Sequence, residues 1–111
     1  MFMASIFTKI IAREIPSDIV YEDSEIIVIK DINPKAKIHL LIIPKKEIPT
    51  INDLQEDDKC LIANMFFVAK KIAKDFKIEE WYQLHFNVWP KWWQEVMHIH
   101  LHLLSDLKDY E

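Results

Sequence analysis

Polar and aliphatic residues alternate most clearly at residues 98–104, which read His-Ile-His-Leu-His-Leu-Leu. Successive side chains of a β-strand point to opposite faces, so this alternation predicts a strand over residues 96–104. The aliphatic side chains would be buried, and the three histidines would share the other face. Three of the five histidines of the chain lie in this segment, which favours a functional surface over an ordinary solvent-facing strand.

A helical period of apolar positions runs through residues 54–76 and predicts one long helix, capped by Asn52 or Asp53. A short helix is predicted over residues 6–14, with Ser5 as its cap. Further apolar runs predict strands over residues 19–22, 25–30, 39–44 and 82–88. The connections are of hairpin length, so we expect an α+β fold. The fold would consist of a five-stranded antiparallel sheet, one long helix packed on it, and a short helix near the N-terminus of the chain.

Length, charge and cysteine count narrow the classes of function that the chain can have. With 111 residues, we expect one domain, residues 1–111. A formal charge of -4 argues against binding to a nucleic-acid backbone. No apolar run approaches the ~20 residues of a membrane span, and the N-terminal segment lacks the pattern of a signal peptide. Cys60 is the only cysteine, which excludes an internal disulfide and favours a reducing, cytoplasmic setting. Its apolar neighbours predict that Cys60 is buried.

Three imidazoles on one strand face suit an extended substrate better than a single metal ion. The first and third would be about 13 Å apart at ~3.3 Å per residue, whereas Zn–N bonds are ~2.1 Å long. A metal site on one His-x-His pair stays an alternative. Imidazole titrates near pH ~6.5, so at neutral pH it can attack, donate a proton or bind an anionic oxygen. A phosphoryl group with a leaving group needs these roles at spaced points.

The run of histidines resembles the signature of the histidine triad (HIT) superfamily, His-φ-His-φ-His-φ-φ, where φ is apolar. Further segments resemble its small Hint-type branch, in order and at its spacing, so that the resemblance covers essentially the whole chain. These segments are residues 5–11, 14–16, 21–23, 31–34, 39–46, 86–88 and 94–96.

The resemblance implies hydrolysis of nucleoside 5′-phosphoramidates and related adenylates. It assigns the nucleophile to His100, which would form a covalent nucleotidyl-histidine. His98 and His102 would contact phosphate oxygens, and one of them would help to deliver a proton to the leaving amine. His39 would orient the nucleophilic ring through its second nitrogen. The resemblance also implies a homodimer, formed by the strand at residues 82–88 and the long helix.

The resemblance further implies a small-molecule partner, a purine nucleotide. Its ribose hydroxyls would be held by Asp31, and its base pocket would be lined by Ile32 and by Phe7, Ile10 and Leu41, for which ordinary core packing is an equal alternative. On the phosphate side it implies Asn87, Gln94 and Glu95, although an ionised carboxylate cannot donate a hydrogen bond. His85 matches no catalytic position of the family, and we expect it to be exposed.

Some family members bind structural zinc through cysteines near the N-terminus. The matching positions here are Ser5 and Thr8, so we expect neither a metal nor another cofactor.

The chain contains no glycine. Tryptophan stands at four positions where the family usually has glycine, and residues 77 and 105 also match such positions; the tryptophans are Trp81, Trp89, Trp92 and Trp93. This pattern indicates either a glycine-free design or an oddity of coding or translation. A left-handed backbone costs a non-glycine residue ~1–2 kcal/mol. We therefore expect an intact fold with an impaired site, or alternatively a purine-nucleotide-binding module with weak or no turnover.

Overall fold

The computed structural model describes residues 4–106 of the chain, and the elements follow the predicted order. The helices are α1 (Ile6–Ile11) and α2 (Lys59–Asp75). The strands are β1 (Ile19–Glu22), β2 (Ile26–Lys30), β3 (Ile38–Pro44), β4 (Gln83–His85) and β5 (Leu101–Ser105). Three single turns of 3-10 helix are η1 (Ile51–Asp53), η2 (Glu56–Asp58) and η3 (Pro90–Trp92).

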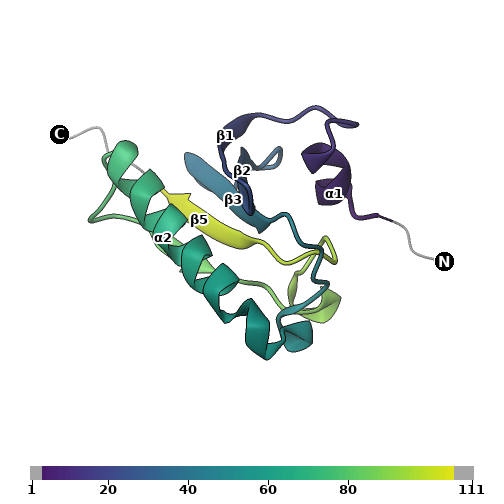
Figure 1. The fold of residues 1–111 in the computed structure, drawn as a ribbon. Coiled ribbons are helices and arrows are strands. Elements are labelled where there is room, and N and C mark those ends of the chain that lie inside the picture. Colours follow the sequence, from purple (N-terminus) through teal and green to yellow (C-terminus); the bar gives the residue numbers. More distant parts are fainter. Residues whose placement is uncertain (1–3, 107–111) are drawn as a thin grey trace.

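The five strands form one antiparallel sheet in the order β1-β2-β3-β5-β4, which confirms the predicted α+β architecture. The sheet lies between the two helices, with α2 along one face and α1 toward the other (Figure 1). Within residues 4–106, no helix has the length and apolarity needed to cross a bilayer.

Each face of the sheet has its own apolar core, because side chains alternate along every strand. The core under α2 joins apolar residues of that helix to one set of strand side chains, including Ile26, Val28, Leu40, Ile42, Leu101 and Leu103. The core under α1 uses the other set, namely Ile27, Ile29, Leu41 and Ile43, together with Phe7 and Ile10 of the helix. The short α1 covers only part of its face, and the remaining part carries the histidines.

The alternation predicted for residues 98–104 is present, although the hydrogen-bonded strand begins only at Leu101. Leu101 and Leu103 pack under α2. The ring of His100 instead meets the ring of Phe7 from α1, at a centroid distance of 5.0 Å. The amide of Ile99 donates to the carbonyl oxygen of Ile48 at 2.8 Å, which holds this irregular segment beside the chain that follows β3.

The long helix begins five residues later than predicted, at Lys59. The N-cap residue of α2 is Asp58, so the prediction of Asn52 or Asp53 was wrong. Thr50 caps η1, where Asp53 completes a capping box. The apolar stripe of α2 is centred on residues 65–73. Cys60 lies off this stripe and is exposed, so the prediction that it is buried was wrong.

Two of the four tryptophans have a backbone that favours glycine. Trp89 has φ 73° and ψ 149°, and Trp93 is left-handed with φ 68° and ψ 21°. Trp81 and Trp92 are not among the residues with positive φ. All four indoles are exposed, so the fold accommodates them by turning the rings into solvent, and the cost falls on the backbone of the loop.

We expect Trp89→Gly and Trp93→Gly each to raise the free energy of unfolding by about 1 kcal/mol, because each relieves a positive φ. Trp92→Gly is the matched control: it lacks that strain, so glycine there should lower the free energy of unfolding by roughly 0.5–1 kcal/mol. Urea unfolding followed by circular dichroism measures all three. Equal effects at the three positions would contradict the strain.

Candidate active site

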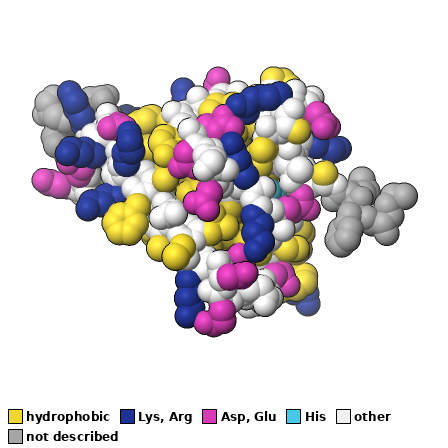
Figure 2. Space-filling model, in the orientation of Figure 1, with side chains coloured by type: hydrophobic (Ala, Val, Ile, Leu, Met, Phe, Trp, Pro, Cys, Tyr) yellow, Lys and Arg dark blue, Asp and Glu magenta, His cyan; other side chains and the backbone are white. Residues whose placement is uncertain are grey.

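A cavity of about 300 Å³ opens on the sheet face that α1 leaves uncovered. Its walls come from β3, β4, β5 and the loops beside them. The lining residues are Asp31, Lys35, His39, His85, Asn87, Trp93, Glu95, His100, His102 and Leu104. Four of the five histidines of the chain therefore meet in one place. Little histidine surface is visible on the face drawn in Figure 2, where Lys, Arg, Asp and Glu side chains are interspersed with apolar ones.

His100 is held as a neutral ring with one free nitrogen. Its Nδ1 lies 2.8 Å from the carbonyl oxygen of His98. A carbonyl can only accept, so Nδ1 carries the proton and Nε2 keeps its lone pair. Burial lowers the pKa of His100, which keeps the ring uncharged at neutral pH. The predicted role of His39 in orienting this ring was wrong, because a main-chain carbonyl holds its second nitrogen instead.

His39 positions a different imidazole, that of His102. The amide of Lys35 donates to Nδ1 of His39 at 3.1 Å, so the proton of His39 lies on Nε2. That nitrogen is 2.9 Å from Nδ1 of His102, to which it donates. The proton of His102 therefore lies on Nε2. The atom Nδ2 of Asn87, 3.4 Å from it, is itself a donor and cannot accept this proton. Burial, followed by the charges of neighbouring groups, lowers the pKa of His102 to about 3.

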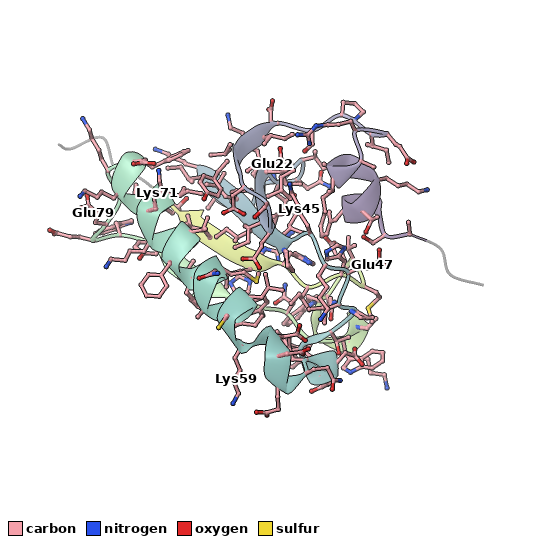
Figure 3. All side chains as sticks on the ribbon, in the orientation of Figure 1. Glu22, Lys45, Glu47, Lys59, Lys71 and Glu79 are labelled. Carbon is pink, nitrogen blue, oxygen red and sulfur yellow. The ribbon has the colours of Figure 1, made fainter. Side chains whose placement is uncertain are left out.

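His98 lies outside the cavity and is fully buried. Its Nε2–H donates to the carbonyl oxygen of Pro44 at 2.7 Å, and its Nδ1 accepts from the hydroxyl of Ser5 at 2.7 Å. Ser5 also caps α1, as predicted, and Thr8 donates to the nearby carboxylate of Glu47, which Figure 3 labels beside α1. With both ring nitrogens engaged, His98 has none left for a phosphate oxygen, which corrects that expectation.

Of the three residues expected near the phosphate, two line the cavity and one is buried in the loop between β4 and β5. Asn87 and Glu95 line the cavity. Gln94 is 2% exposed, and its side-chain amide holds the loop together: it accepts from the amide of Trp89 and donates to two main-chain carbonyls, those of Pro49 and Val96. Gln94 therefore shapes the loop rather than facing the cavity.

Of the five residues expected around the nucleoside, only one lines the cavity. Asp31 lines the cavity, with its carboxylate 3.4 Å from Nε2 of His39. Phe7, Ile10 and Leu41 are buried in the core under α1. Ile32 is 87% exposed and is not a lining residue.

His85 is the site residue that the sequence reasoning missed. It is half-buried rather than exposed, and its ring stacks on that of His102 at a centroid distance of 4.6 Å and an angle of 5°. The two residues face each other in the β4–β5 register. Burial lowers the pKa of His85. A signal was present in the sequence, since His85 lies two residues before Asn87 in the predicted strand and so shares its face.

Three potential ligand groups in this cavity have atoms within 4.8 Å of one another: Asp31, His39 and His102. A metal ion bound to Nε2 of His39 would displace the proton from that nitrogen. The proton could not move to Nδ1, which already accepts from the amide of Lys35. The cluster is therefore arranged as a hydrogen-bonded chain, and the absence of a metal stays a prediction.

The family model described as "Scavenger mRNA decapping enzyme C-term binding" matches residues 4–110. A purine nucleoside phosphoramidase of Escherichia coli (strain K12) is 48% identical over 102 residues, which cover 91% of this chain and 86% of the relative. The chain belongs to the histidine triad (HIT) family.

Other HIT proteins match over almost their whole length. An uncharacterized HIT-like protein of Buchnera aphidicola subsp. Baizongia pistaciae (strain Bp) is 45% identical over 94% of both chains. The crystal structure of a HIT family hydrolase from Legionella pneumophila Philadelphia 1 matches with a TM-score of 0.91 and 49% identity, covering 95% of each chain. The chain therefore shares the fold of these HIT proteins over most of its length.

We expect the HIT domain to lose stability as the pH falls below 6.5, the ordinary pKa of histidine. Because the pKa of His102 is about 3 in the folded protein, the unfolded chain binds more protons between these values. The contribution is present above pH 6.5 and is lost progressively toward pH 3. The free energy of unfolding in urea, at pH values of about 7.5 and 5, should fall less in His102→Asn than in the wild type. Equal losses would contradict the buried neutral ring.

Proposed function

We propose that this HIT protein hydrolyses nucleoside 5′-phosphoramidates and related nucleotide conjugates, such as AMP joined to an amine. The observation that carries the proposal is the pairing of two neutral imidazoles at one cavity. His100 keeps a lone pair on Nε2, and His102 presents a proton on Nε2. A nucleophile beside a fixed donor is the arrangement that phosphoryl transfer requires. The name of the Escherichia coli relative, purine nucleoside phosphoramidase, supports the same reaction.

In the proposed first step, Nε2 of His100 attacks phosphorus. The bond from nitrogen to phosphorus forms while the bond from phosphorus to the leaving amine breaks, and the amine takes a proton from solvent. Nδ1 keeps its hydrogen bond to the carbonyl oxygen of His98, which stabilises the positive charge that develops on the ring. His102 donates to a phosphoryl oxygen. Water then attacks phosphorus, the bond from phosphorus to Nε2 of His100 breaks, and a proton of the water passes to solvent. The nucleotide is released and the imidazole is neutral again.

The nucleoside would occupy the end of the cavity nearest α1. Asp31 offers its carboxylate to the ribose hydroxyls there, and the exposed apolar side chain of Ile32 is available to pack against a purine base. Phe7 is in edge contact with His100 and would back the same end, with Ile10 and Leu41 behind it.

A purine-nucleotide-binding module with weak turnover is the second candidate. The strained backbone at Trp89 and Trp93 favours it, because this loop borders the cavity through Trp93 and Glu95. Calorimetry that finds AMP binding without hydrolysis would favour this candidate. If strain impairs the enzyme, the double variant Trp89→Gly/Trp93→Gly will raise kcat by several-fold, whereas an unchanged kcat would contradict the impairment.

We also propose that the protein works as a homodimer in a reducing, cytoplasmic setting. β4 is an edge strand of the sheet, and Phe66 and Phe67 of α2 are exposed. An uncovered edge strand beside an apolar helix face invites pairing with a second copy. Light scattering that gives a monomer mass would contradict the dimer.

We expect His100→Ala to reduce the hydrolysis of an AMP–amine conjugate by about 10³-fold or more, because it removes the attacking nitrogen. His102→Asn should cost about 10²-fold, the size of losing one oriented donor. A rapid quench in alkali should trap AMP attached to the wild type but not to His100→Ala, because a phosphorus–nitrogen bond to histidine survives base and is cleaved in acid. Circular dichroism serves as the folding control. Equal rates in the wild type and His100→Ala would exclude the proposed nucleophile.

A further inference from the structure

The cavity has two chemically different ends. Toward β3, Asp31 and His39 lie within ion-pair distance of each other, at the end where the proposed ribose would bind. At the opposite side, the loop after η3 contributes Trp93 and Glu95, beside His85 from β4. A nucleotide whose phosphorus faces His100 would therefore direct its leaving group toward this loop.

The fixed charges of the cavity do not suit a purely anionic substrate. Its lining includes two carboxylates, Asp31 and Glu95, against one ammonium group, that of Lys35. The histidines add no compensating charge, since burial lowers the pKa of all four that line the cavity. A phosphoryl anion would add more negative charge to an excess of carboxylates. A cation carried by the substrate would balance this excess of negative charge.

Glu95 is the group placed to bind that cation. Its carboxylate is exposed, and it takes part in no ion pair with any residue between 4 and 106. It lines the same cavity as His100. The indole of Trp93, 69% exposed at the same mouth, offers an aromatic face to a cation. A carboxylate and an aromatic face together are typical of a site for an ammonium group.

We propose that Glu95 and Trp93 make this protein selective for nucleotide conjugates whose leaving amine carries a second, positively charged group. This inference rests on the proposed hydrolase function and names its class of leaving group. Such a substrate brings the cation that the cavity lacks. Once the amine has left, the nucleotide faces Glu95 without that cation, which favours its release.

Two AMP phosphoramidates of matched length test the proposal. One carries 1,4-diaminobutane, whose free end is an ammonium group, and the other carries n-pentylamine, which ends in a methyl group. The wild type should show a kcat/KM about three- to fivefold higher for the diamine conjugate, the size expected of an exposed ion pair. Glu95→Gln should bring this ratio close to one. Added salt should lower the ratio in the wild type.

Glu79→Gln is the matched control. Glu79 lies just beyond the C-terminal end of α2 and does not line the cavity (Figure 3), so this variant should keep the wild-type ratio. Hydrolysis of both conjugates with a ratio that Glu95→Gln leaves unchanged would overturn the selectivity and leave the hydrolase function standing. If the wild type hydrolyses neither conjugate, the proposed function fails, and the inference fails with it.

Discussion

One main-chain hydrogen bond, from Nδ1 of His100 to the carbonyl oxygen of His98, determines what the buried histidines can do. It fixes the tautomer, so that the lone pair lies on Nε2 of a ring that lines the cavity. Burial adds the second requirement, because it holds the pKa of His100 below its usual range and keeps the ring neutral. A nucleophilic imidazole needs both conditions. The first comes from a main-chain carbonyl and the second from burial.

The rest of the fold maintains this geometry. His98 is held between Pro44 of β3 and Ser5, the N-cap residue of α1, so the carbonyl oxygen that holds His100 comes from a fixed position. His39 does the same for His102 through a chain of hydrogen bonds that begins at the main chain of Lys35. The three histidines of the motif therefore have different partners and different roles. His98 anchors the segment, and in the proposed reaction His100 attacks phosphorus while His102 donates to a phosphoryl oxygen.

Alternation along the strand predicted which side chains share a face, and this was enough to foresee the sheet and the grouping of His100 with His102. Sequence separation could not show which ring bonds to which, because His39 reaches its partner across the β3–β5 register. The sequence analysis also missed His85, because its place in the cavity depends on the pairing of β4 with β5, which puts it opposite His102. The late start of α2 was missed because two turns of 3-10 helix, η1 and η2, occupy the chain before it, and Thr50 caps the first of them.

The most direct test of this account is the protonation state of His100, read by nuclear magnetic resonance of protein with ¹⁵N-labelled histidine rings. Long-range correlations between ring nitrogens and carbon-bound protons distinguish the two neutral tautomers and the charged form. We expect the ring to be less than half charged at pH 6.5, where an ordinary histidine is half protonated, and its neutral form to carry the proton on Nδ1. A ring protonated on Nε2, or half charged at that pH, would contradict this account.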